Sequence, residues 1–201
     1  MRTVEIKLYS FDELSEEVQQ KVIEKNPEIG IWEDWYEGLY DYYKNSGDIN
    51  GFDIEKIYFS GFWSQGDGAM FEGSVNKNLF NNLKPNYASE EYKRDFKRVI
   101  KLITSEHITL WGKFKHCGHY YHHKSYIENL EFEFQNGKND YPNIQSVLDD
   151  IIDSIKTEYE DLCKKIYIDL ESEYEYLTSY EHVSSTLIDG DYEFTENGEF
   201  Y

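Results

Sequence analysis

The feature of this sequence that most constrains its fold is a long amphipathic pattern in the C-terminal third. Beginning at Tyr141-Pro142-Asn143, apolar residues advance by three or four positions as far as Leu177. That spacing predicts one acidic helix over residues 143–178, roughly eight or nine turns long. Such a helix exceeds the usual length in globular domains, so we expect it either to protrude or to form a homodimer with a second copy. Its apolar stripe consists of Leu148, Ile151, Ile152, Ile155, Tyr159, Leu162, Ile166, Leu170, Tyr174 and Leu177.

The rest of the sequence alternates strand patterns with helix patterns. Ser10 and Glu13 match a capping box, which predicts the start of a helix after a short alternating strand. We therefore expect a single α+β domain over residues 1–201, in which an antiparallel sheet of about five or six strands is packed by helices. The expected strands cover 3–9, 52–63, 69–75, two or three segments within 108–138, and 192–201; the other expected helices cover 10–25, 31–45, 89–106 and 179–188.

Two aromatic strand patterns flank a polar hinge, Ser64-Gln65-Gly66-Asp67-Gly68. Its glycines permit positive φ, so the backbone there can approach a ligand closely. An apolar wall with a few polar groups is typical of a ligand pocket. The same residues also suit a plain hairpin loop in which Asp67 and Ser64 bond to their own backbone. The ligand-binding candidates in the hinge are Trp63, Ser64, Gln65 and Asp67.

The segment HCGHYYHHKSY holds a cluster of potential metal ligands: His116, Cys117, His119, His122 and His123. As a strand, residues 116–123 would place successive side chains on opposite faces, and neither face would hold a standard zinc ligand set. We therefore expect no metal and no cofactor. Packing or hydrogen bonding is the plainer role for these side chains. If the segment lies beside the hinge, His119 and Tyr121 become ligand-binding candidates, and Asp67 with His122 becomes a candidate catalytic general-base pair.

The charge of the chain is strongly negative and unevenly placed. Residues 126–201 hold 20 acidic and 4 basic residues, which accounts for −16 of the net −20. A field of this sign repels nucleic acid and anionic membranes and attracts basic surfaces, so we expect neither a nucleic-acid nor a membrane partner. A solvated, solubilising surface is the alternative interpretation.

Carboxylates spaced along a rod can imitate the phosphate backbone of a nucleic acid. The long helix therefore predicts a surface that binds a basic protein in competition with nucleic acid. The partner-binding candidates are Asp149, Asp150, Asp153, Glu158, Asp161, Asp169, Glu171, Glu173 and Glu175.

Composition also indicates a cellular setting. Cys117 and Cys163 are the two cysteines, too few for a disulfide framework. The N-terminal residues show no apolar run typical of a signal peptide, and no stretch approaches the ~20 apolar residues of a transmembrane helix. We therefore expect a cytoplasmic protein.

Several segments of the chain resemble a family of small accessory proteins of bacteriophages and prophages. The resembling segments are YSFDELSEEVQQKVIEKN, YFSGFWSQGDGAMFEG, GHYYHHKSY and YEFTENGEFY, of which the GFWSQGDGA block is the most distinctive. The resemblance implies an anti-defence protein acting in a bacterial host cell, for example an anti-CRISPR inhibitor. It carries no catalytic residue set, and a non-enzymatic role is expected. An antitoxin that neutralises a basic toxin would use the same acidic surface.

Overall fold

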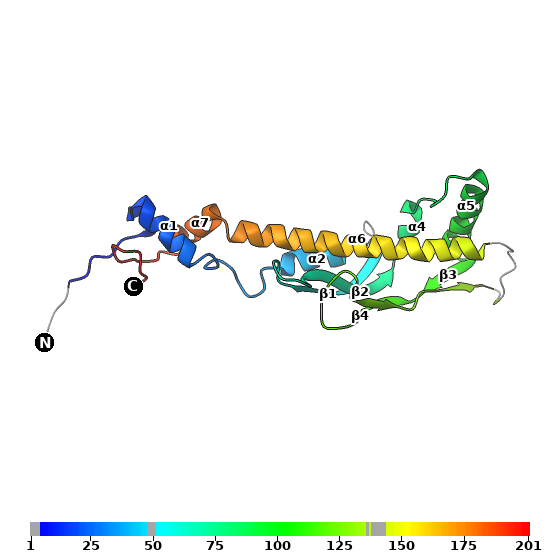
Figure 1. The fold of residues 1–201 in the computed structure, drawn as a ribbon, viewed down its shortest axis with the longest axis horizontal. Coiled ribbons are helices and arrows are strands. Elements are labelled where there is room, and N and C mark those ends of the chain that lie inside the picture. The colour runs from blue at the N-terminus through cyan, green and yellow to red at the C-terminus, as the bar shows by residue number, and fades with distance from the viewer. Residues whose placement is uncertain (1–4, 48–50, 136, 138–143) are drawn as a thin grey trace. The chain divides into compact units, whose positions relative to one another are not determined.

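The structure is a computed structural model that describes residues 5–47, 51–135, 137 and 144–201. Where the sequence predicts one domain, residue contacts separate two compact units. Unit 1 consists of Met1–Glu37 and Leu170–Tyr201, and unit 2 consists of Gly38–Asp169. The two ends of the chain therefore fold together in unit 1. The long helix α6, Gln145–Leu177, begins in unit 2 and ends in unit 1 (Figure 1).

Antiparallel strands form the frame of unit 2, as the α+β prediction expects. β1 and β2 form a hairpin in which Ser60 pairs with Gly68, so the hinge lies in the loop at its tip. The four-stranded sheet has the order β1-β2-β4-β5, and β3 and β6 form a two-stranded sheet. The strands are β1 Phe52–Ser60, β2 Gly68–Val75, β3 Ile108–Trp111, β4 Lys113–His116, β5 Tyr126–Glu128 and β6 Glu131–Phe134.

The two sheets share one continuous two-stranded ribbon. Trp111 pairs with Glu131, and Phe114 pairs with Glu128, so the register is unchanged across the break. The break lies at Gly112, where φ is +124°, and the Asn129 side chain accepts a hydrogen bond from the Lys113 N–H at 2.9 Å. The described residues form six strands, where about five or six are expected, but all six lie within residues 52–134. The single expected sheet divides in two because the ribbon is interrupted at Gly112.

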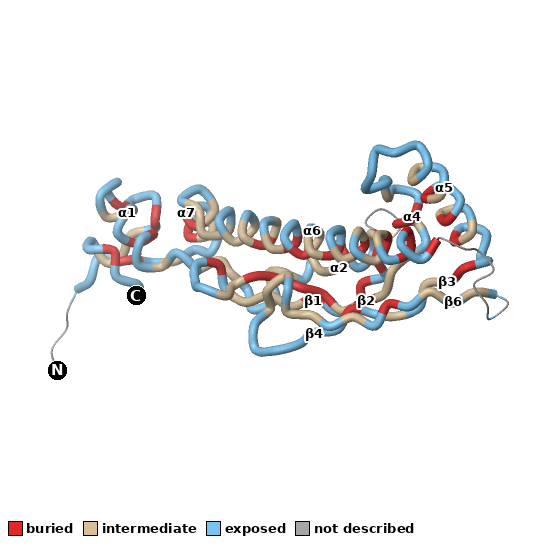
Figure 2. Tube along the Cα trace, turned by 45° about the vertical axis from the view of Figure 1, so that its right-hand side comes forward, coloured by how far each residue is buried: buried red, intermediate tan, exposed pale blue. Residues whose placement is uncertain are grey.

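α6 lies along one face of the four-stranded sheet in unit 2 (Figure 1). Tyr159 is fully buried there, its ring stacks on Phe114 with centroids 3.9 Å apart, and its hydroxyl donates to the Phe71 carbonyl at 2.7 Å. Figure 2 marks further buried positions along α6, β1 and β2. The predicted amphipathic stripe is confirmed at six positions, and the sequence pattern omitted two further buried residues, Val147 and Cys163. The other predicted members, Ile152, Leu162, Tyr174 and Leu177, are half-buried. The buried positions are Val147, Leu148, Ile151, Ile155, Tyr159, Cys163, Ile166 and Leu170.

Helices complete unit 2. The helix α5, Glu90–Thr104, agrees with the basic helix predicted at 89–106, and Ser89 is its N-cap. The aromatic helix predicted at 31–45 begins later, because residues before Glu37 form successive turns, such as Trp35 N–H to the Trp32 carbonyl at 3.2 Å. The helices are α2 Glu37–Asn45, α4 Leu79–Asn82 and α5 Glu90–Thr104.

Unit 1 has its own small hydrophobic core, in which Phe11 packs edge-on against Phe194. The N-terminal segment contributes a 3₁₀ turn η1, Phe11–Glu13, and α1, Glu16–Lys25, and the C-terminal segment contributes α7, Tyr180–Asp189. The core consists of Phe11, Leu14, Val22, Ile23, Val183, Leu187 and Phe194.

Three sequence predictions in unit 1 are wrong in detail. The expected strands at 3–9 and 192–201 reduce, in the described residues, to isolated bridges such as Tyr9 with Phe194. Ile6 is 52% exposed, so the alternation there does not mark a buried face; Thr3 and Val4 lie outside the described residues. Ser10 donates its N–H to Glu13 at 2.9 Å, but this cap starts a single 3₁₀ turn, and α1 begins at Glu16.

Candidate functional site

The hinge is a turn at the tip of the β1–β2 hairpin, closed by a side-chain hydrogen bond. The Asp67 carboxylate accepts a hydrogen bond from the Ser64 N–H at 2.7 Å, and Gly66 has φ +95°. Ser64 and Gln65 are exposed, and Trp63 is 71% exposed. The Asp67 carboxylate therefore has a structural role in closing the loop, as the plain hairpin interpretation predicts.

The histidine segment is not a strand, which corrects the predicted alternation over residues 116–123. β4 ends at His116 and β5 begins at Tyr126, and the residues between them form turns and bends. His116 and Tyr121, predicted on opposite faces, have ring centroids 5.0 Å apart. His122 and His123 are also side by side, with ring centroids 3.8 Å apart. The alternation fails because the segment leaves the sheet after His116.

The structure brings the hinge and the histidine segment together. A Cβ placed on Gly66 would lie 2.9 Å from the Tyr120 ring, and one on Gly68 would lie 3.0 Å from the His122 Cα. A cavity of about 320 Å³ lies where these segments meet α6. Its walls are Asp67, Gly68, Ala69, His122, His123, Cys163, Lys164, Tyr167 and Ile168.

Two titratable side chains in the cavity wall, His123 and Cys163, are held in their neutral forms. Burial, the neighbouring His122 and then Lys164 lower the pKa of His123 below its ordinary 6.5, so the imidazole is neutral at physiological pH. Burial raises the pKa of Cys163 to about 12, which keeps it a thiol. Among the described residues no hydrogen bond joins Asp67 to His122. The cavity suits binding of a small uncharged group better than nucleophilic or general-base chemistry.

The two cysteines should differ sharply in reactivity. Cys117 is exposed and Cys163 is buried. Because the thiolate is the reactive form, a thiol reagent at neutral pH should label Cys117 rapidly and Cys163 only after unfolding. The measurement is a stopped-flow colour reaction on native and urea-unfolded protein, with Cys117→Ser as the control that should lose the fast phase. Two fast thiols in the native protein would contradict the buried position of Cys163.

The remaining ligand candidates do not converge on one site. His119 is exposed, and Tyr121 stacks on Tyr58 at 5.1 Å between ring centroids. Within residues 5–47, 51–135, 137 and 144–201, no group of three or more His, Cys, Asp or Glu side chains is arranged to hold a metal ion. The same residues contain no helix that is both long and apolar enough to cross a membrane.

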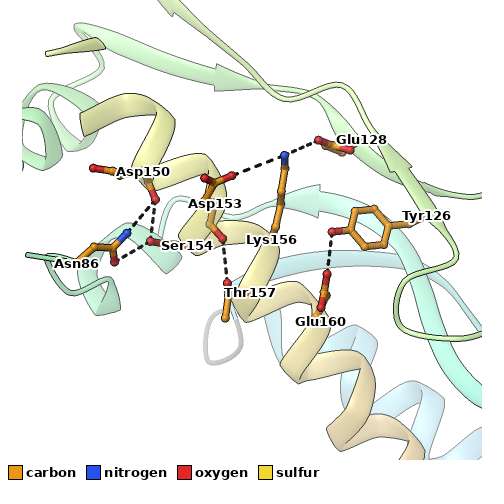
Figure 3. Close-up of polar contacts among 9 residues, drawn as sticks. All are labelled: Asn86, Tyr126, Glu128, Asp150, Asp153, Ser154, Lys156, Thr157 and Glu160. Carbon is orange, nitrogen blue, oxygen red and sulfur yellow. Dashed lines mark hydrogen bonds and ion pairs between the residues drawn. The ribbon is translucent and has the colours of Figure 1, made fainter. Parts of the chain in front are cut away.

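The acidic side chains of α6 in unit 2 are partly engaged within the protein. Lys156 lies between Asp153 and Glu128, at 3.9 and 2.8 Å, and links α6 to β5 (Figure 3). Asp161 pairs with Lys164 at 2.8 Å, and Asp169 accepts a hydrogen bond from the Tyr43 hydroxyl. Asp149, Asp153, Glu158 and Asp161 are exposed, whereas Asp150 and Asp169 are half-buried.

Unit 1 is the more acidic part of the molecule. Its two segments hold 19 acidic and 4 basic residues, a net charge of −15, whereas unit 2 holds 21 acidic and 16 basic residues, net −5. In the part of unit 1 that the structure describes, the only ion pair joins Lys21 to Glu17. Glu175 is exposed, Glu171 and Glu173 are half-buried, and further exposed carboxylates are Glu16, Glu24, Glu181, Asp189, Asp191, Glu193, Glu196 and Glu199.

Sequence reasoning missed the site residues that distant segments contribute. Cys163, Lys164 and Tyr167 reach the cavity from α6, about a hundred residues after the hinge. The acidic N-terminal segment was also missed, since only the fold joins it to the C-terminal segment. Helical spacing placed Cys163 near the apolar stripe, but no sequence signal indicated the hinge as its neighbour.

The comparisons with known proteins identify a family but no activity. A family model described as "Domain of unknown function (DUF8835)" matches residues 35–180, a range that contains all of unit 2. No curated protein and no solved structure matches the chain. The family description names no bacteriophage source, so the resemblance to phage accessory proteins stays a prediction. Because the match covers more than half of the sequence, the chain belongs to the DUF8835 family.

Proposed function

We propose that this protein is a non-enzymatic inhibitor that binds a basic, nucleic-acid-handling protein through the acidic surface of unit 1. A defence nuclease of a bacterial host cell, such as a CRISPR effector, is a partner of the required chemistry. The inhibitor would act in the cytoplasm by occupying the nucleic-acid site of that partner. The bacteriophage origin remains part of this proposal.

The charge of unit 1 is the observation that carries the proposal. Exposed carboxylates from both ends of the chain gather on one small folded unit with net charge −15. Almost none of them is neutralised by a neighbouring lysine or arginine in the described residues. Fixed charges of one sign on a folded surface raise association rates with an oppositely charged surface, as a nucleic acid does.

Affinity capture tests the proposal directly. The tagged full chain is incubated with a bacterial lysate containing an active CRISPR effector, and bound proteins are eluted by rising salt or by added duplex DNA. We expect the effector to be captured and released by both eluents, since duplex competes for the same site. Capture that duplex DNA leaves unchanged would contradict occupation of a nucleic-acid site.

A matched pair of charge-reversed variants locates the surface. Reversal of Glu193, Glu196 and Glu199 to lysine changes three exposed carboxylates of unit 1. Reversal of three exposed carboxylates on α6 in unit 2 makes the same change in net charge: Asp149, Asp153 and Glu158. We expect the unit 1 variant to weaken capture of the effector by at least about tenfold and the unit 2 variant to weaken it less. Equal losses would show that only net charge matters.

A second candidate function is small-ligand binding in the hinge cavity. The observation that favours it is the meeting of the hinge, His122 and His123 around a cavity of about 320 Å³. Ile168 lines this cavity and is 56% exposed, so Ile168→Trp should fill it without disturbing the core. Ligand-observed NMR with a library of small aromatic compounds should find binders of the native protein that this variant does not bind. A screen without such binders would remove this candidate.

A further inference from the structure

The outer edge of β3 lies where β2 leaves the sheet. β2 pairs with β4 at Gly73 and Ser74 and ends at Val75, so its continuation would run beside β3. The chain instead turns into α4, Leu79–Asn82. Within the described residues, β3 pairs with β6 on one side and with no strand on the other. Figures 1 and 2 show β3 beyond the end of the four-stranded sheet, near α4 and α5. A strand position beside β3 is therefore vacant in the described structure.

The ladder geometry determines which backbone groups face that position. Gln135 donates its N–H to the His107 carbonyl at 3.0 Å, so His107 faces β6. Because successive residues of an antiparallel strand face opposite sides, Ile108 and Leu110 direct their N–H and C=O groups away from β6. Ile108 is fully buried, so the outward groups that reach the surface are those of Leu110. His116 is an even number of residues further along the same side of the ribbon, so its backbone also faces away from the paired strand. Its N–H points toward β2 and donates to the Glu72 carboxylate at 3.0 Å.

A groove of about 420 Å³ lies beside this edge. Its lining mixes apolar and polar side chains. Apart from β3, the lining residues are the apolar Val75, Phe80 and Ile103 and the polar or charged Lys77, Asn78, Asn81, Thr104 and Glu106. Ile108, Thr109 and Leu110 form the wall on the β3 side. The groove thus combines the outward N–H and C=O groups of Leu110 with apolar side chains, which are the two elements of strand-addition sites.

We propose that this groove binds an extended peptide segment of a partner protein, which adds to β3 as a further strand. Apolar side chains of the peptide enter the groove, and the alternate side chains, lysine or arginine, lie on the outer face of the ribbon. The site is in unit 2 and does not depend on the acidic surface of unit 1.

The outer face of the ribbon supplies the reason for basic side chains. Trp111 is 60% exposed there, and the same face carries Glu131 opposite Trp111 and Glu133 opposite Thr109. Neither glutamate makes an ion pair with a described residue. A lysine or arginine on the added strand would lie beside Trp111, and its long side chain would extend across β3 toward the two carboxylates of β6. A second copy of the chain fits this edge poorly, because it would bring the same glutamates and a net charge of −20 with it.

The test uses a blocked, fluorescent peptide in which lysine and valine alternate, with the full chain as the receptor. Binding is measured by fluorescence anisotropy at about 0.15 M salt, where long-range attraction is screened. The control peptide has the same sequence with its backbone amides N-methylated, which preserves charge but prevents strand addition. We expect the control to bind at least about tenfold more weakly. Amide hydrogen exchange at Leu110 should slow when the unmethylated peptide binds.

Two variants place the binding on this edge. Leu110→Pro removes an N–H that faces the groove and leaves the bonds to β6 intact, as proline at an edge strand does. Thr104→Trp fills the groove from an exposed position at the end of α5. Both should retain the native circular dichroism spectrum and lose peptide binding. Equal affinity for the methylated peptide, unchanged binding by both variants, or no binding at all would overturn the proposal. Self-association of the chain through β3, detected by sedimentation, would overturn it as well.

Discussion

Replacing Tyr159 with alanine should lower the free energy of unfolding by about 3–5 kcal/mol, the range for removing a large buried aromatic side chain. The ring is fully buried between α6 and the sheet, with centroids 3.9 Å from Phe114, 4.5 Å from Phe71 and 4.7 Å from Tyr126. No neighbouring side chain can fill the space without leaving its own contacts. Urea unfolding followed by circular dichroism measures the change.

Two further variants separate the contributions at this position. Tyr159→Phe keeps the ring and removes only the hydroxyl that donates to the Phe71 carbonyl, so it should cost about 1–3 kcal/mol. Ile168→Ala truncates an exposed side chain on the same helix and should change stability by less than about 0.5 kcal/mol. If alanine at 159 cost no more than alanine at 168, the packing of α6 on the sheet would be wrong.

We expect Gly112→Ala, which adds one methyl group to the ribbon, to destabilise the fold strongly. A Cβ at this position would lie 2.3 Å from the Asn129 carbonyl oxygen, which is backbone of the paired strand and cannot rotate away. The residue also has φ +124°, a region that L-residues rarely adopt. The ribbon would have to separate at the point where β3 meets β4, and the free energy of unfolding should fall.

Gly118→Ala is the matched control for that experiment. Gly118 has φ +98°, but a Cβ there would meet nothing within 4 Å. It should therefore carry only the cost of positive φ, about 1–2 kcal/mol, and Gly112→Ala should cost at least about 2 kcal/mol more. Urea unfolding gives both values, and hydrogen exchange of β3 and β6 should increase in the Gly112 variant. Equal costs would show that the ribbon can straighten without losing its pairing.

The charge of the protein illustrates what folding adds to composition. In the sequence, the acidic residues gather after residue 126, and α6 is the obvious surface. In the structure, lysines of α6 neutralise part of that helix, and the N-terminal segment joins the C-terminal segment in unit 1. The surface that we expect to bind a basic partner is therefore on unit 1, at carboxylates such as Glu193 and Glu196, and not on the long helix.

Elements that depend on local periodicity could be predicted from the sequence. The stripe of α6, the helix α5 and the β1–β2 hairpin are all set by spacing or by residues within a few positions of each other. The contacts between those elements could not be predicted, because they depend on packing between distant parts of the chain. The contact of the hinge with His122, the cavity over Cys163 and the open edge of β3 each depend on where the chain leaves a sheet. The points at which the chain leaves a sheet depend on long-range packing and, in the ribbon, on the conformation of Gly112. Neither can be recognised from a local pattern in the sequence.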